Sequence, residues 1–226
     1  MRVPKSLVVV ALALAGACIG NSIRAEDAKQ DTGYWVTTSG SLKISEAWRA
    51  GMVVQTRSQD DLSHLERTVL RPSLSYNVVG KTWLTAGYDA HFIELPTDRL
   101  EQRAWQQFLT IWPASFASLS ARIRLEERFI ENVDGTALRL RLKGRADFPI
   151  EGTEWKITAS NEYFVGLNDL EAGPKAGFDQ NRAYLGVARP LTDFLSVKLG
   201  YQMQYVNRNA AADSMIHQLM IGVSIN

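Results

Sequence analysis

The sequence predicts an all-β fold, an antiparallel transmembrane up-and-down β-barrel of 10 to 12 strands. Apolar and polar residues alternate with a period of two along most of the chain, in segments that are mostly ten residues or longer. Strands in soluble sandwiches average about 5–6 residues, whereas strands that cross a bilayer need about 9–11 residues, apolar outward and polar inward. Beyond the N-terminus the sequence has no run of about 18 apolar residues, which excludes a helical membrane protein.

Composition excludes several other classes of protein. The net charge is +1, from 25 basic and 24 acidic side chains, so bulk charge indicates no nucleic-acid partner. A single Cys excludes a disulfide framework and a cysteine-rich metal site. The sequence also lacks a glycine-rich phosphate loop and metal-spaced histidines, so we expect no cofactor and no bound metal.

Residues 1–25 are typical of a secretory signal peptide. A short basic start precedes an apolar stretch from Leu7 to Ile19, and Ala25 closes a suitable cleavage site. Lipoprotein processing at Cys18 is an alternative, but the preceding residues lack the large aliphatic side chain expected three places earlier. Cleavage would remove three basic residues and the single Cys, changing the net charge from +1 to −2. We expect an exported chain with a short leader at 26–33 and a barrel at 34–226.

The alternation is clearest in the second half of the chain. At 138–148, three leucines at even positions alternate with Arg139, Arg141 and Lys143. Similar alternation at 118–128, 155–165, 196–205 and 218–226 predicts four more strands; weaker copies lie at 48–57, 65–78, 82–94 and 179–189, and the poorest at 34–42 and 101–112. These eleven candidates are an odd number, whereas bacterial single-chain barrels use even numbers. Either segment 34–42 is not a wall strand, leaving ten, or one hairpin is missed, giving twelve.

The predicted connections alternate in length, as in outer-membrane barrels. Aromatic residues flank every short connection, which is typical of rings that favour the headgroup zone; they are Trp48, Trp83, Trp112, Phe116, Phe148, Trp155 and Phe194. A second group, with Phe129, Tyr163, Phe164 and Tyr205, lies toward the long connections. The short connections are 43–47, 79–82, 113–117, 149–154 and 190–193, and the longer ones are 58–64, 95–100, 131–136, 167–178 and 207–214.

The side chains predicted to face inward are strongly basic. A small barrel cannot leave such charges unpaired in a dry interior, so they must meet water, carboxylates or a ligand. We expect a narrow porin-like channel or a small anionic-ligand site with a basic lumen; the alternative is a structural barrel whose lumen is plugged by salt bridges. The lumen and ligand candidates are Arg122, Arg124, Glu126, Arg128, Arg139, Arg141, Lys143, Arg145, Glu162, Asp179 and Arg182.

Catalytic residues are not indicated. The three histidines are His64 in a predicted loop, His91 on the predicted inward face and His217 at the start of the last strand. The chain has no nucleophile-elbow motif, and hydrolysis needs a nucleophile, a base and an orienting group together. We expect no enzyme, with an outer-membrane lipid hydrolase as a less favoured alternative.

Several motifs together resemble the domain-of-unknown-function family 2490. They are the runs at 103–107, 122–128, 138–142, 161–164, 177–182 and 200–201, so the resemblance covers about residues 34–225. It implies a bacterial outer-membrane β-barrel and no established activity. We therefore expect the outer membrane of a Gram-negative bacterium, with outer-membrane lipid, the barrel-assembly machinery and a small anionic solute as partners, and no nucleic acid.

Overall fold

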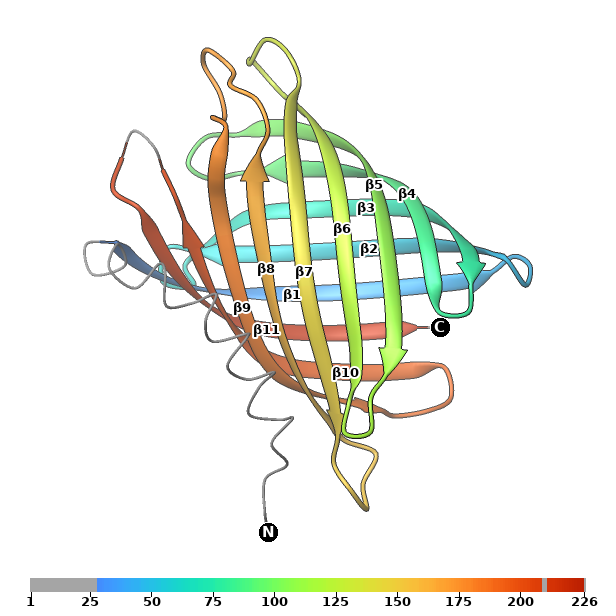
Figure 1. Cartoon of the computed structure of the whole chain (residues 1–226). Coiled ribbons are helices and arrows are strands. Elements are labelled where there is room, and N and C mark those ends of the chain that lie inside the picture. Colours follow the sequence, from blue (N-terminus) through green and yellow to red (C-terminus); the bar gives the residue numbers. More distant parts are fainter. Residues whose placement is uncertain (1–27, 209–210, 226) are drawn as a thin grey trace.

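The computed structural model describes residues 28–208 and 211–225. The expected signal peptide lies outside these residues. The described residues form eleven strands that close into one barrel (Figure 1). In chain order the strands are β1 (Lys29–Lys43), β2 (Trp48–Gln59), β3 (His64–Val79), β4 (Thr82–Ile93), β5 (Arg99–Pro113), β6 (Ser118–Ile130), β7 (Ala137–Pro149), β8 (Lys156–Gly166), β9 (Gly177–Pro190), β10 (Leu195–Val206) and β11 (Ser214–Ile225). No helix in the described part is long and apolar enough to span a membrane.

The predicted fold class is confirmed, and each of the eleven candidate segments is a strand. Strand lengths run from 11 residues in β8 to 16 in β3, which is enough to cross a bilayer. The first strand is longer than predicted. It begins at Lys29, so part of the expected leader at 26–33 belongs to the barrel wall.

The expectation of an even strand number is wrong for the described residues. Segment 34–42 is a wall strand, and β1 closes the barrel by pairing with β11 in parallel, from Lys29 opposite Ser214 to Gly40 opposite Ile225. All other neighbouring strands are antiparallel. An odd number of alternating strands gives the first and last the same direction, so the seam that closes the barrel must be parallel.

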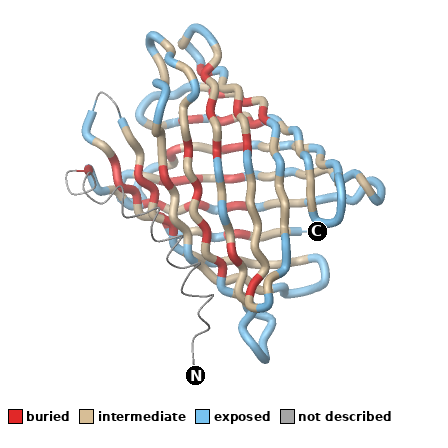
Figure 2. Tube along the Cα trace, viewed as in Figure 1, coloured by how far each residue is buried: buried red, intermediate tan, exposed pale blue. Residues whose placement is uncertain are grey.

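The pattern of burial in this barrel is the reverse of that in a water-soluble protein, where apolar side chains are buried and charged ones are exposed. Large apolar side chains on the outside are open, with Leu185 at 59% and Ile123 at 50% exposure, whereas the inward Asp89 and Glu126 are fully buried. Figure 2 shows this alternation of buried and exposed residues along the strands. An outer wall of exposed leucine, isoleucine and valine suits a hydrocarbon surround rather than water. The structure thus separates a lipid-compatible exterior from a charged interior.

The connections alternate in position as predicted. One end of the barrel carries the turns at 44–47, 80–81, 114–117, 150–155 and 191–194. The other end carries the connections at 60–63, 94–98, 131–136, 167–176 and 207–213. Gly80 has a φ of 56°, a left-handed conformation that favours glycine in the two-residue turn between β3 and β4. We call the two ends the short-turn end and the long-loop end.

Two aromatic residues do not lie in the predicted outer belts. Trp83 occupies an inward position on β4, where the guanidinium carbon of Arg49 lies 4.6 Å from its ring centre. Phe164 also points inward, on β8, and is fully buried. Others remain on the outside near the short-turn end, where Trp48 is half-exposed and lies 4.9 Å from Tyr76 between ring centres. Position beside a turn predicted these belts, but strand parity decides which face a ring occupies.

Candidate functional site

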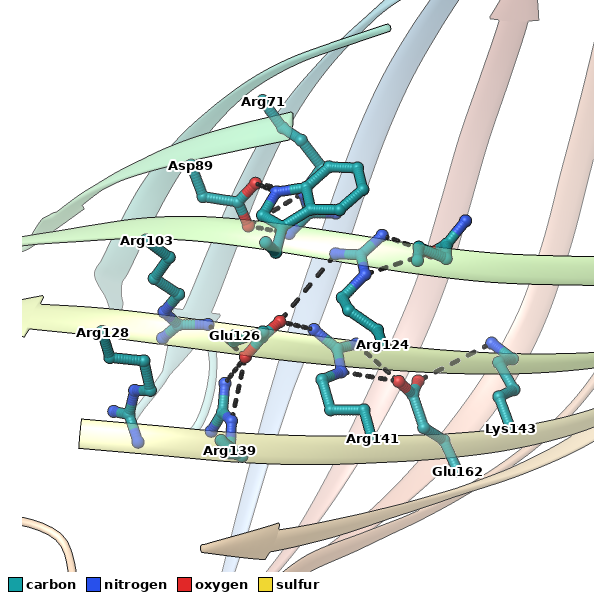
Figure 3. Close-up of polar contacts among 12 residues, drawn as sticks. Arg71, Asp89, Arg103, Arg124, Glu126, Arg128, Arg139, Arg141, Lys143 and Glu162 are labelled. Atoms are coloured by element: carbon teal, nitrogen blue, oxygen red, sulfur yellow. Dashed lines mark hydrogen bonds and ion pairs between the residues drawn. The ribbon is translucent and has the colours of Figure 1, made fainter. Parts of the chain in front are cut away.

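Glu126 and Glu162 lie at the centre of the charged interior. They occupy inward positions on β6 and β8, and the inward arginines of β7 lie between these two strands. Glu126 accepts hydrogen bonds from Arg139, at 2.9 Å from Nε and 2.6 Å from Nη2, and from Arg141 Nη1 at 2.6 Å. Glu162 accepts from Arg141 Nε at 2.7 Å and also from Arg122. Arg141 therefore bridges two buried carboxylates, as Figure 3 shows.

Three further carboxylates extend this arrangement toward the long-loop end and across the lumen. Glu101 accepts from Arg103 Nε at 2.7 Å and from Arg128 Nε at 2.6 Å. Asp179 lies 2.9 Å from Arg139 Nη1. Asp89 takes a bidentate pair from Arg71 at 2.7–2.9 Å and a hydrogen bond from Trp105 Nε1 at 2.6 Å. Bidentate and charge-assisted contacts of this kind fix side chains firmly in place. We call these carboxylates and their arginines the central network.

Aromatic rings fill the space between the charged groups. The guanidinium of Arg124 lies 3.8 Å from the ring centre of Trp105 and donates two hydrogen bonds to Gln107, at 2.7 and 3.0 Å. Phe164 is surrounded by the guanidinium carbons of Arg139, Arg141 and Arg182, at 4.5–5.2 Å from its ring centre. Cations held over aromatic faces are attracted by the negative face of the ring.

The indole of Trp105 lies across a glycine on the neighbouring strand. Gly87 pairs with Trp105, and a Cβ added at Gly87 would collide with the indole ring. The absence of a side chain at Gly87 therefore lets a large ring lie flat against the inner wall. With Asp89, His91, Glu126 and Phe164 all fully buried, the described side chains fill the middle of the lumen.

The structure brings most of the predicted lumen candidates into direct contact with the central network. Arg145 differs, because it pairs with Asp147 of its own strand, at 2.7 Å toward the short-turn end. Arg182 differs as well, because it donates to Gln180 at 3.0 Å and forms no ion pair with a described carboxylate, although Glu162 lies opposite it on β8. The nine candidates within the network are Arg122, Arg124, Glu126, Arg128, Arg139, Arg141, Lys143, Glu162 and Asp179.

Sequence reasoning missed several members of this interior. Arg103 and Trp105 belong to segment 101–112, whose alternation is poor because inward Leu109 and Ile111 are apolar and outward Gln102 and Gln106 are polar. Phe164 follows Glu162 at the same inward parity, so strict counting along the strand would have found it.

Open space remains on both sides of the filled layer. At the long-loop end, a cavity of about 650 Å³ is lined by residues of the barrel rim, by the loops at 131–136 and 167–176, and by Asn207 and Arg208. In Figure 1 these two loops project side by side. We call this cavity the outer vestibule. Toward the short-turn end, a second space of about 390 Å³ is lined by Ser118, Ser120, Lys143 and Arg145, among others.

The histidines do not meet in one site. His91 faces the lumen, 3.4 Å from Asp89, whereas His217 faces outward and contacts Tyr201 Oη at 2.5 Å and Gln30 Oε1 at 2.9 Å. His64 lies at the long-loop end, 3.3 Å from Asp60. In residues 28–208 and 211–225, no three His, Cys, Asp or Glu side chains are grouped as metal ligands.

An exposed apolar wall around a buried charged interior defines the class of protein, a β-barrel of the outer-membrane type. The model of the family "Protein of unknown function (DUF2490)" matches residues 32–215, and the chain belongs to this family. An uncharacterised protein of Methylorubrum extorquens is 29% identical over 223 residues, covering 95% of this chain and 96% of its own.

A solved outer-membrane barrel has a similar fold. The NanC porin superposes with a TM-score of 0.54 at 12% identity, over 87% of this chain and 98% of its own. A loop-deletion mutant of OmpT, an outer-membrane protein of Vibrio cholerae, superposes with a TM-score of 0.40 at 10% identity, over 81% of this chain and 87% of its own. The likeness to the porin concerns the fold alone.

Proposed function

We propose that this protein is a barrel of a Gram-negative outer membrane that binds a small anionic solute in its outer vestibule and is closed across its middle at rest. In this proposal the chain is exported with cleavage after Ala25, assembled by the barrel-assembly machinery and surrounded by lipid, and it has no catalytic role. The observation that carries the proposal is the charge of the vestibule lining. Five cationic side chains line it, Arg99, Arg128, Arg139, Lys175 and Arg208, with one acidic side chain, Asp179.

The single acid in the vestibule is already neutralised. Asp179 is held by Arg139 at 2.9 Å, and Arg128 is held by Glu101. Within the described residues Arg99 and Arg208 have no ion pair with a carboxylate, so their charge is available to a ligand. A volume of about 650 Å³ lies within the range of small-molecule sites. A cavity lined by cationic side chains and low-dielectric protein raises the local concentration of anions.

Burial of the central network supports binding rather than a permanently open pore. An aqueous channel would leave its lining wet, whereas Glu126 and Phe164 are fully buried. The same network supports a second candidate function, a structural barrel whose lumen is plugged. The two candidates differ in one property: only the first requires that an anion bind in the outer vestibule.

The test is calorimetric titration of the folded barrel with citrate, a small polycarboxylate. We expect saturable binding that weakens at higher salt, and about tenfold weaker binding when Arg99 and Arg208 are both changed to Gln. Lys81→Gln, at the short-turn end, is the matched control and should leave binding unchanged. An unchanged citrate affinity in the Arg99→Gln, Arg208→Gln variant, or glycerol binding as tight as citrate binding, would refute the proposal and favour the plugged barrel.

Two further measurements test the membrane assignment and the closed state. We expect the folded protein to fractionate with outer membranes and to show a heat-dependent mobility shift on a gel. In planar bilayers the unmodified barrel should give no steady conductance steps. Recovery as soluble periplasmic material would contradict the membrane assignment, and steady anion-selective steps would contradict closure.

A further inference from the structure

Two arginines in the lumen, Arg57 and Arg182, form no ion pair with a carboxylate among the described residues. Arg57 on β2 donates to the amide oxygen of Gln55 from Nε at 2.9 Å and from Nη2 at 2.7 Å. Arg182 on β9 donates from Nη2 to the amide oxygen of Gln180 at 3.0 Å. Among the described residues, neither guanidinium lies within 4.0 Å of a carboxylate oxygen. Arg57 is nonetheless 94% buried, so bulk water does not solvate its charge.

Both arginines lie against the same indole. The guanidinium carbon of Arg57 is 3.9 Å from the ring centre of Trp35, and that of Arg182 is 4.9 Å from it. Trp35 belongs to β1, so closure of the barrel brings β1 and β2 to the same part of the lumen as β9. A guanidinium stacked on a ring keeps its in-plane N–H groups free to bind a carboxylate or phosphate. Two like charges beside one ring repel each other unless an anion is shared between them.

The surrounding polar groups mostly offer unused donors. Arg182 Nε, Trp35 Nε1 and Gln218 Nε2 are buried and have no hydrogen-bond partner. One acceptor, Gln204 Oε1, is also unpaired. A buried donor without a partner costs free energy, and an oxyanion could satisfy several donors at once. The hydrogen-bonded side chains around these groups are neutral amides and Thr37. Glu162 lies opposite Arg182 on β8, but the two side chains form no ion pair.

We propose that Arg57, Arg182 and Trp35 form a second, deeper site that binds a small oxyanion, a phosphate or carboxylate group. The inference deepens and rests on the proposed function, because the ligand arrives through the outer vestibule. Gln180 connects the two places: it lines the vestibule, and its amide oxygen holds Arg182. The anion then lies between the β1–β2 and β9 sides of the lumen; Glu162, opposite Arg182 on β8, has its charge already compensated by Arg122 and Arg141.

The experiment titrates the folded full-length barrel with inorganic phosphate and, separately, with acetate. Both anions offer the same oxyanion chemistry, and their relative affinity identifies which group the site prefers. We expect binding of at least one, and about tenfold weaker binding after Arg57→Gln or Arg182→Gln. Arg49→Gln is the matched control, since Arg49 also lies over an indole, that of Trp83, but near the short-turn end. It should leave binding unchanged.

Folding of each variant is checked by its heat-dependent mobility shift on a gel. If a Gln variant does not fold, Arg57→Lys replaces it; this change keeps the charge but removes the planar fork, and binding should again weaken. If the vestibule pair Arg99→Gln and Arg208→Gln weakens binding while Arg57 and Arg182 variants bind normally, the deeper site is refuted and the vestibule stands. If no variant alters binding, both are refuted.

Discussion

Glu126→Gln is the change that tests the central network most directly. The side chain is fully buried and receives three hydrogen bonds from Arg139 and Arg141, with Arg103 Nη1 and Arg124 Nη1 at 3.8 and 3.9 Å. Glutamine has nearly the same shape but no charge, so it leaves these cations with too little compensation. Breaking a buried pair by neutralising one partner costs about 3–5 kcal/mol, which is our estimate for the loss of unfolding free energy.

The matched control is the next residue on the same strand. Glu127 points outward, and it forms no ion pair with another described residue. Glu127→Gln changes the net charge by the same amount as Glu126→Gln but leaves the buried network intact. We expect it to alter the unfolding free energy by less than about 0.5 kcal/mol. The comparison therefore separates the buried network from a general effect of charge.

The assay is reversible guanidinium unfolding of the barrel in lipid vesicles, followed by tryptophan fluorescence. A stability change shifts the midpoint and leaves the slope unchanged. If Glu126→Gln does not fold, Arg141→Met added to it should restore folding, because the pair of changes removes one charge of each sign. A loss below about 1 kcal/mol, or an equal loss from Glu127→Gln, would contradict the assignment of Glu126 as the central buried anion.

Three further predictions concern the inner wall, the outer wall and the seam. Gly87→Ala should lower the unfolding free energy by about 1–3 kcal/mol because the new methyl group displaces Trp105. Gly144→Ala has open space around it and should change the unfolding free energy by less than about 0.5 kcal/mol. Equal effects of the two changes in denaturant unfolding would contradict the packing of Trp105 on Gly87. Leu142→Lys should cost about 2–4 kcal/mol because it places a charge on the lipid-facing wall, and an unchanged midpoint in vesicles would argue against that orientation. Thr38 and Val223 pair across the seam, so the double variant Thr38→Cys, Val223→Cys should be cross-linked within one chain by a short bifunctional maleimide. The cross-linked product is detected by its shifted mobility on a gel. A failure to cross-link while both thiols remain reactive would argue against parallel closure.

The strand pattern was predictable because period-two alternation is a local property. Arg139, Arg141 and Lys143 alternate with leucines over a few residues, so the sequence alone assigns one set to the lumen and the other to the outside. The alternation of short and longer connections followed from where this pattern stops. The count of strands did not follow, because segment 34–42 is weakly patterned and its partner, β11, lies at the other end of the chain.

The central network was predictable only as a set of inward charges. Which carboxylate meets which arginine depends on the register between strands, and the central network joins residues up to 40 positions apart, such as Arg139 and Asp179. The pairing of Arg57 and Arg182 on Trp35 needs β1, β2 and β9 to come together through closure. No local pattern contains that information.

The sequence by itself thus determined the class of fold and the inward face of the clearly alternating strands, since both depend on the geometry of a single strand. Only the tertiary structure decided that the barrel closes with a parallel seam, that the middle of the lumen is filled, and that Arg57 and Arg182 meet at the ring of Trp35. These properties depend on curvature and register across the whole wall. They are settled when distant strands pair, because pairing places side chains from opposite ends of the chain within contact distance.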